Sequence, residues 1–113
     1  MALQWSVAEA ALDPATGAEQ NGIRPVLIVS NEEFNGAMPN VTILPLTSTQ
    51  RRLYPSEVLL PKGVAGQPRD SIMMAHQVRT ISKQRLRNTI GHLEDASLRQ
   101  QVQDALREHF DLD

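Results

Sequence analysis

Hydrophobic residues along this chain come in short runs, separated by polar segments that contain Gly, Pro, Asn and Ser. Short apolar runs bounded by turn residues are typical of buried β-strands. The pattern predicts strands at residues 26–29, 41–44, 57–60 and 89–93, and a strand over 71–81 that is interrupted near His76. Residues 61–70 hold too many Gly and Pro for regular structure and are predicted to form a long connection.

The segment before the first loop has two interpretations. Residues 5–8 favour a β-strand, whereas residues 8–12 (Ala-Glu-Ala-Ala-Leu) have good helix propensity. A first strand here is therefore expected to be short or irregular. Trp5 is interpreted as an aromatic residue of the core or of a dimer surface, in preference to a platform for a nucleobase.

Helical signals are concentrated at the C-terminus. Between Asp95 and Phe110, apolar residues recur at spacings of three and four, which predicts an amphipathic helix capped by Asp95 or Ser97. Residues 30–33 match a capping box and predict one helical turn that ends at Phe34, followed by a connection over 35–40. A capped turn is also predicted at 82–86.

Five to seven short strands and one terminal helix indicate a mainly β protein with a small, strongly bent antiparallel sheet. A chain of 113 residues suffices for one modest core, so residues 1–113 are expected to form a single domain.

Composition narrows the class of protein. The chain has no cysteine, and its three histidines are far apart in sequence, so neither a metal centre nor a cofactor is expected. No apolar run approaches the ~20 residues that span a bilayer, and the N-terminus does not resemble a signal peptide. We expect a soluble, cytoplasmic protein without membrane contact.

Charge is distributed unevenly although the net charge is only −2. The first 50 residues carry one Lys or Arg against five acidic residues, and residues 88–113 carry two against six. Residues 51–87 carry eight against two. A basic middle third in an acidic chain is the asymmetry expected of a localised surface for a polyanion.

Arg24 stands out because it is the only basic residue among the first 50. It follows a glycine-bracketed polar loop and precedes Pro25 and the predicted strand at 26–29. Proline biases the residue before it toward an extended backbone, so the guanidinium should leave the strand end in a defined direction.

Several motifs in this order resemble the MazF/PemK toxin family. They are Gly17-Ala18-Glu19-Gln20-Asn21-Gly22-Ile23-Arg24-Pro25-Val26-Leu27-Ile28-Val29-Ser30-Asn31, Pro45-Leu46-Thr47-Ser48, Tyr54-Pro55-Ser56-Glu57-Val58, Asp70-Ser71, His76-Gln77-Val78-Arg79-Thr80-Ile81 and Arg85-Leu86. The likeness covers most of the chain. It departs from the family at the N-terminus, where Gln4-Trp5-Ser6-Val7 replaces a basic residue followed by Gly-Asp.

The resemblance implies a small SH3-like barrel of the MazF/PemK/CcdB type that forms a homodimer. It also implies a toxin of a type II toxin–antitoxin pair, blocked by a cognate MazE-like antitoxin. Such a toxin is a metal-independent endoribonuclease that cleaves single-stranded RNA at short motifs, leaving 2′,3′-cyclic phosphate and 5′-hydroxyl ends. The family's catalytic arginine and threonine correspond to Arg24 and Thr47.

The residue that moves protons is left open. His76 lies inside a family motif and suits acid–base work by its unperturbed pKa of ~6.5. Its roles are ranked as RNA contact, proton carrier and core histidine. Glu19 is a rival base, or a residue that positions its loop. Further RNA contacts are predicted for Gln77, Arg79, Arg51, Arg52 and Tyr54, where Arg51 and Arg52 also fit a solvated loop.

Two other functions compete with this one. A CcdB-like toxin would share the barrel and bind DNA gyrase without nuclease chemistry, because fold alone does not fix activity. The other alternative is an inactive paralogue, because the N-terminus departs from the family pattern.

Overall fold

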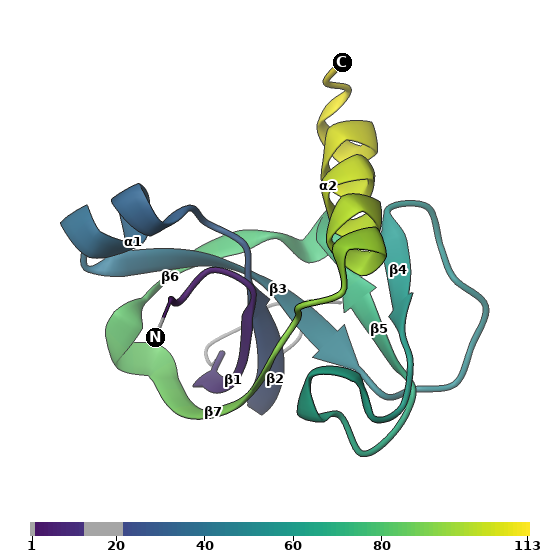
Figure 1. The fold of residues 1–113 in the computed structure, drawn as a ribbon, viewed down its shortest axis with the longest axis horizontal. Coiled ribbons are helices and arrows are strands. Elements are labelled where there is room, and N and C mark those ends of the chain that lie inside the picture. The colour runs from purple at the N-terminus through teal and green to yellow at the C-terminus, as the bar shows by residue number, and fades with distance from the viewer. Residues whose placement is uncertain (1, 13–21) are drawn as a thin grey trace.

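An antiparallel sheet forms the body of the protein (Figure 1). The computed structural model describes residues 2–12 and 22–113, and within these ranges the sheet has seven strands. The strands are β1 (Ser6–Ala11), β2 (Ile23–Ile28), β3 (Asn40–Thr47), β4 (Glu57–Leu60), β5 (Ser71–Met74), β6 (Arg79–Ser82) and β7 (Leu86–His92). The helices are α1 (Glu32–Ala37) and α2 (Ala96–Phe110), with 3-10 turns η1 (Val64–Gly66), η2 (Ala75–Gln77) and η3 (Lys83–Arg85).

The sheet is bent because β3 pairs with three other strands. Its first half pairs with β6, its middle with β2, and its last two residues with β5. The strand order is β4-β5-β3-β2-β1-β7, with β6 attached to β3. The result is a barrel-like sheet that stays open between its edge strands β4 and β7, which confirms the predicted mainly β class.

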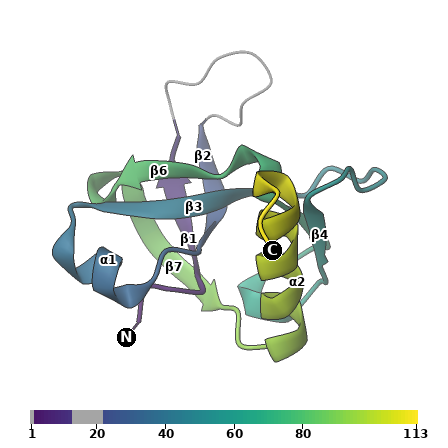
Figure 2. The same cartoon turned by 90° about the horizontal axis from the view of Figure 1, so that it is seen from above.

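Two hydrophobic clusters lie on the two faces of the sheet. Because side chains alternate along a strand, β2 contributes Leu27 to one cluster, and Val26 and Ile28 to the other. The first cluster is covered by α2 through Val102 and Ala105. Figures 1 and 2 show α2 beside β4, at the opposite end of β3 from α1.

Elements with strong local signals are where the sequence predicts them. The Asp95 carboxylate caps α2 by accepting a hydrogen bond from the Leu98 N–H at 2.9 Å. Ser82 caps η3 by accepting from the Gln84 N–H at 3.1 Å. Strand β4 covers the predicted residues 57–60, and η2 interrupts the next strand at His76. Trp5 is buried in the first cluster, as one of its two interpretations requires.

The helical interpretation of residues 8–12 is wrong. These residues belong mostly to β1, which lies between β2 and β7 and pairs with both. Two register shifts against β7 make the strand irregular. Pairing on both sides satisfies the backbone of β1, and this tertiary effect outweighs a weak local preference for helix.

The helix α1 is longer than predicted. It continues past Phe34 to Ala37, and its cap is Asn31, whose side chain accepts from the Phe34 N–H at 2.8 Å. The buried Asn35 explains the extension, because its amide donates to the Ser30 carbonyl at 2.8 Å and its own carbonyl accepts from the Lys83 ammonium. The prediction of a connection over 35–40 is therefore wrong.

Strand β3 is also longer than predicted, since it runs through Pro45 to Thr47. Proline lacks an N–H but is tolerated where that group has no ladder partner to lose. As a result, Thr47 belongs to the sheet and does not lie in the loop after it. Its backbone is fixed by pairing with Ile72 of β5.

A close approach between η1 and β7 requires glycine at position 91. A Cβ atom built there would lie 2.4 Å from the Ala65 carbonyl, which is a clash with backbone. Gly66, at φ +75°, meets Ile90 in the same contact. The contact holds the segment that follows η1 against the sheet, near the end of β2.

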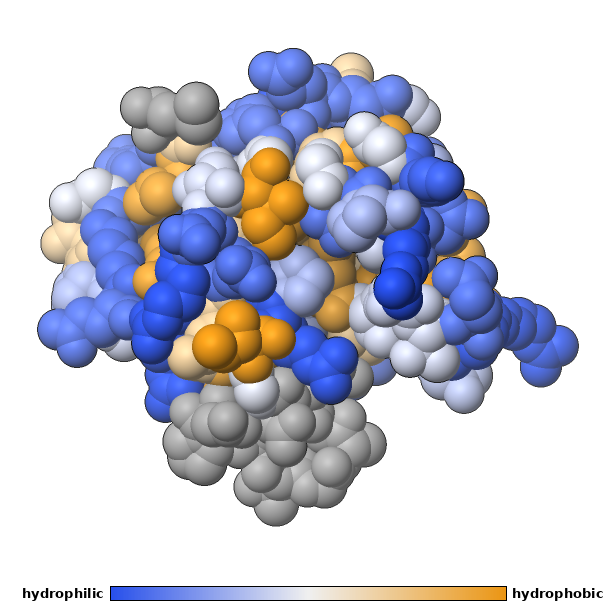
Figure 3. Space-filling model, turned by 90° about the horizontal axis from the view of Figure 1, so that it is seen from below, coloured by the Kyte–Doolittle hydropathy of each residue, from blue (hydrophilic) through white to orange (hydrophobic). Residues whose placement is uncertain are grey.

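The surface is mixed in character. Figure 3 shows one face on which hydrophobic side chains form separate islands among hydrophilic ones. The exposed large apolar side chains include Ile23, Leu53, Tyr54 and Leu59. Among the described residues, none of the helices combines the length and the apolar character that crossing a membrane demands.

Candidate functional site

Arg24 and Thr47 lie at the same end of the adjacent strands β2 and β3. The pairing of these strands ends at Val26 opposite Pro45, two residues short of both side chains. Arg24 itself pairs with Ala10 of β1, and Thr47 with Ile72 of β5. By strand alternation Arg24 points to the side of Val26, and Thr47 to the side of Ile43. Val26 and Ile43 belong to the same hydrophobic cluster. Both candidate catalytic side chains therefore lie on one face of the sheet, at the same end of the two strands.

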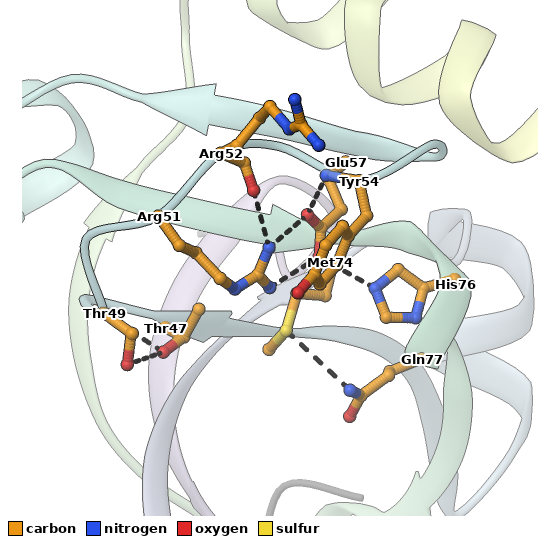
Figure 4. Close-up of polar contacts among 9 residues, drawn as sticks. All are labelled: Thr47, Thr49, Arg51, Arg52, Tyr54, Glu57, Met74, His76 and Gln77. Atoms are coloured by element: carbon orange, nitrogen blue, oxygen red, sulfur yellow. Dashed lines mark hydrogen bonds and ion pairs between the residues drawn. The ribbon is translucent and has the colours of Figure 1, made fainter. Parts of the chain in front are cut away.

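The two side chains differ in exposure. Arg24 is the second residue of β2 and is exposed, whereas the Thr47 residue is only 7% exposed. The Thr47 hydroxyl donates to the Thr49 hydroxyl at 3.1 Å and accepts from the Thr49 N–H at 3.3 Å (Figure 4). These contacts hold the Thr47 hydroxyl at the rim of the sheet, where the exposed segment 48–50 begins.

Arg79 lies on the same face. It sits opposite Ile43 in the pairing of β6 with β3, and directly opposed residues share a face. One terminal guanidinium nitrogen of Arg79, Nη1, is buried and has no hydrogen-bond partner within residues 2–12 and 22–113. A buried guanidinium N–H without an acceptor is costly, so this nitrogen is a feature of Arg79 that the described residues leave unsatisfied.

A pocket of about 270 Å³ opens beside Arg24. It is lined by Arg24, Glu9, Ser48, Gln67, Arg69 and Ser71, among others. The backbone contact of η1 with β7 places Gln67 and Arg69 there. The lining combines two arginines and one acid, Glu9, with neutral polar and apolar groups, so two positive charges face this hollow against one negative charge.

Next to this end of the sheet, the carboxylate of Glu57 collects four hydrogen bonds (Figure 4). Arg51 donates two of them in a bidentate pair at 2.8 Å each, and the Tyr54 N–H donates the third at 2.7 Å. The His76 Nε2 lies 2.8 Å from Oε2, the oxygen that also accepts from Arg51 Nη2. The Glu57 side chain is 0% exposed, against 24% for Arg51 and 30% for His76.

These contacts decide the charge of Glu57. Burial by itself would raise the pKa of this carboxyl, but the hydrogen bonds from Arg51, Tyr54 and His76 outweigh it and lower the pKa to about 2. The same hydrogen bonds raise the pKa of Arg51. Because an ionised carboxylate only accepts, this hydrogen bond requires a proton on His76 Nε2.

Tyr54 and Arg52 complete the loop. The Arg51 guanidinium carbon lies 4.3 Å from the centroid of the Tyr54 ring, a cation–π contact, and Tyr54 is 56% exposed. Arg52 is exposed, and its carbonyl accepts from Arg51 at 3.1 Å. Gln77 in η2 is half-buried, with its amide nitrogen 3.8 Å from the Met74 sulfur.

The predicted site residues thus form two groups. Arg24, Thr47 and Arg79 share one face of the sheet, and Arg51, Tyr54 and His76 surround Glu57. Glu19, the alternative base, lies outside the described residues. Sequence-based predictions place Glu57 at the start of a strand and in a family motif, but give it no role in the site. The available signal is a carboxylate five residues after the basic pair at 51–52, in a region that is otherwise basic.

Within the described ranges, no group of three or more His, Cys, Asp or Glu side chains is arranged to hold a metal ion. The candidate site residues offer guanidinium groups, hydroxyls, one imidazole and one buried carboxylate. Such groups recognise phosphates by charge and fork geometry, and they stabilise charge that develops on a reacting phosphate.

The fold is a bent antiparallel sheet with one C-terminal helix, and the candidate arginines lie near the ends of its strands. The model of the PemK-like, MazF-like toxins of type II toxin–antitoxin systems matches residues 3–110. Because that match spans nearly the whole chain, the protein belongs to this family.

Individual relatives agree with the family. The chain is 38% identical over 106 residues to "Endoribonuclease MazF9" of Mycobacterium tuberculosis, covering 89% of each chain. It is 37% identical over 97 residues to "Endoribonuclease EndoA" of Bacillus subtilis, covering 85% of this chain and 83% of that one. The solved structure titled "Mycobacterium tuberculosis toxin MazF-mt6" matches with a TM-score of 0.79 and 32% identity, over 96% of this chain and 98% of that chain.

Proposed function

We propose that this protein is the toxin of a type II toxin–antitoxin pair and that it acts as an endoribonuclease on single-stranded RNA. Its family and the relatives named endoribonuclease support the activity. The observation that supports the assignment of the site is the pairing of β2 with β3, which puts Arg24 and Thr47 at the same end of two adjacent strands.

The proposed reaction is an intramolecular transesterification. The 2′-oxygen of the RNA attacks the adjacent phosphorus, the bond to the 5′-oxygen breaks, and the products are a 2′,3′-cyclic phosphate and a 5′-hydroxyl. Negative charge gathers on the phosphoryl oxygens as the new bond forms. The fork of Arg24 and the hydroxyl of Thr47 offset this charge, and a single such donor contributes about 3 kcal/mol.

Two protons must also move. A base takes the proton of the 2′-hydroxyl, and an acid supplies one to the departing 5′-oxygen. In this proposal His76 faces the RNA through Nδ1, because Glu57 holds Nε2 and its proton. His76 serves there as an RNA contact or as the proton carrier, and Glu19 is the alternative base. Arg79, Gln77 and the loop of Arg51, Arg52 and Tyr54 bind the strand.

The direct experiment incubates the purified protein with a long single-stranded RNA of mixed sequence, with a chelator present throughout. The expected products carry 2′,3′-cyclic phosphate and 5′-hydroxyl ends, which end-specific labelling identifies. Loss of cleavage in the presence of chelator would refute the metal-independent mechanism. Failure of the wild-type protein to cleave at all would favour the inactive paralogue or the CcdB-like binder, and a DNA gyrase inhibition assay separates these two.

The same proposal includes partners and place of action. One neighbouring structure is titled "Endoribonuclease in complex with its cognate antitoxin from Mycobacterial species", with 25% identity and a TM-score of 0.81. By analogy, a MazE-like antitoxin with an acidic, disordered tail would compete with RNA for the basic segment 51–87. We propose a cytoplasmic homodimer in which residues 1–113 form one domain. Light scattering of the eluted peak in size-exclusion chromatography tests the dimer.

A further inference from the structure

Glu57 is the most constrained charged group of the described chain, and the proposed reaction gives it no chemical step. Its buried carboxylate holds two separate segments at once. One is the loop of Arg51 to Tyr54, bound through a side chain and a backbone N–H, and the other is η2, bound through His76. These segments are twenty or more residues apart in sequence, so Glu57 fixes how they face each other.

The pairing with Glu57 changes what Arg51 can do. Both terminal nitrogens of its guanidinium are engaged by the carboxylate, so the fork that would grip a phosphate is already filled. The planar group instead lies against the ring of Tyr54. Arg51 is therefore a support beneath an aromatic side chain and not a phosphate ligand.

Tyr54 has the character of a binding platform. One face of its ring rests on Arg51, yet the side chain remains more exposed than buried, so its other face is open to solvent. The ring belongs to neither hydrophobic cluster. An exposed aromatic ring that is held rigidly, with a neighbouring exposed arginine at position 52, fits a nucleobase with its phosphate, because bases stack on such rings.

We propose that the open face of Tyr54 is a stacking subsite for one nucleobase of the RNA, and that Glu57 is the positioning residue that builds it by holding Arg51 beneath the ring and His76 beside it. This inference rests on the proposed function. It adds that the loop between β3 and β4 binds a nucleobase next to the cleavage position. It also assigns Arg51 a structural role in that subsite.

Tyr54 is the only tyrosine in the chain, so its ring resonances can be followed alone. The probe is a single-stranded RNA of mixed sequence in which every 2′-hydroxyl is methylated, which prevents cleavage. Stacking should move the Tyr54 ring protons upfield in the NMR spectrum as this RNA is added. Chemical-shift changes elsewhere in the spectrum with no change at Tyr54 would overturn the proposal.

Steady-state kinetics with unmodified RNA supply the second test. Tyr54→Ala should raise KM about tenfold with little change in kcat, as expected for the loss of one stacked base. Tyr54→Phe, which keeps the ring, should recover most of the lost affinity. The matched control is Leu53→Ala, which removes a neighbouring exposed apolar side chain and should leave KM unchanged.

The role of Glu57 is tested by Glu57→Gln and, should that variant fold poorly, by Arg51→Lys, which keeps the charge and loses the planar fork. Each should raise KM in the direction of Tyr54→Ala and reduce the shift of the Tyr54 resonances. Wild-type KM in either folded variant contradicts the positioning role. If wild-type protein cleaves RNA and Tyr54→Ala has a normal KM, only the subsite is wrong; if wild-type protein never cleaves, the proposed function itself is wrong.

Discussion

Two regions of the molecule present arginine in opposite ways. Arg24 is placed by the backbone, because it lies near the exposed start of β2. Arg51 is placed by a side chain, because the buried carboxylate of Glu57 binds its fork. The comparison teaches that a basic residue near a candidate site can be fixed by strand position or by a buried anion, and that a buried anion can make it a structural support.

The largest expected effect tests the Arg24 side of this comparison. Arg24→Ala should lower the rate of RNA cleavage about a thousandfold, because it removes the main positive donor to the reacting phosphate. Circular dichroism should show an unchanged fold, since Arg24 is exposed. Arg24→Lys keeps the charge but loses the planar fork. Its cleavage rate should therefore lie between those of the wild-type protein and Arg24→Ala. Cleavage at the wild-type rate by folded Arg24→Ala protein would refute the proposed mechanism.

The second-largest expected effect is on stability, through the dependence of the Glu57 contribution on pH. Burial opposes ionisation of Glu57, but its hydrogen bonds prevail and folding lowers the pKa from 4.5 to about 2. Ionised Glu57 therefore stabilises the fold above its unfolded pKa, and this stabilisation is lost as the pH falls through the window between the two values. Urea unfolding should show that wild-type protein loses about 3 kcal/mol more than Glu57→Gln between about pH 5 and pH 2. Equal losses in the two proteins contradict a charged Glu57 at neutral pH.

A somewhat smaller effect is expected for Thr47, which offers a neutral donor. Thr47→Ala should reduce kcat about a hundredfold, because one hydrogen bond to the developing charge is lost. Thr47→Ser keeps the hydroxyl and should retain much of the rate. An exposed hydroxyl outside the site supplies the control: Ser97→Ala, on α2, should cleave as the wild-type protein does. A rate for Thr47→Ala equal to that of Ser97→Ala removes Thr47 from the site.

The smallest effect comes from an ion pair outside both regions. Asp104 and Arg107 form a pair at 3.0 Å on α2, and both side chains are exposed. Asp104→Asn should change the free energy of unfolding by less than about 0.5 kcal/mol, because exposed pairs gain little in water. The expected contrast with Glu57 is that burial, and not the number of ion pairs, decides how much an ion pair contributes to the free energy of unfolding. A loss as large as that of Glu57→Gln at neutral pH would contradict this reading.

Local signals account for the elements that the sequence predicted well. The helix at 96–110 follows from its apolar spacing and from the Asp95 cap, and the turn at 83–85 follows from Ser82. Both signals act within about four residues, so no knowledge of the rest of the chain is needed. The motif containing Arg24 and Pro25 likewise marked the start of β2.

The wrong predictions come from contacts between segments that are far apart in the sequence. Residues 8–11 have a weak helix preference, and pairing with β2 and β7 overrides it. Helix α1 continues to Ala37 because Asn35 is bound to Ser30 and Lys83, the latter nearly fifty residues away. Such partners are supplied by the fold and are absent from any short window of sequence.

By itself, the sequence determined the mainly β class, the C-terminal helix, the basic middle third and the residue types that suit a phosphate. Only the tertiary structure decided which arginine faces the ligand side of the sheet and which is held by Glu57. The physical reason is that propensities and caps depend on near neighbours along the chain, whereas strand register and the pairing of buried charges depend on segments that meet only in the folded protein.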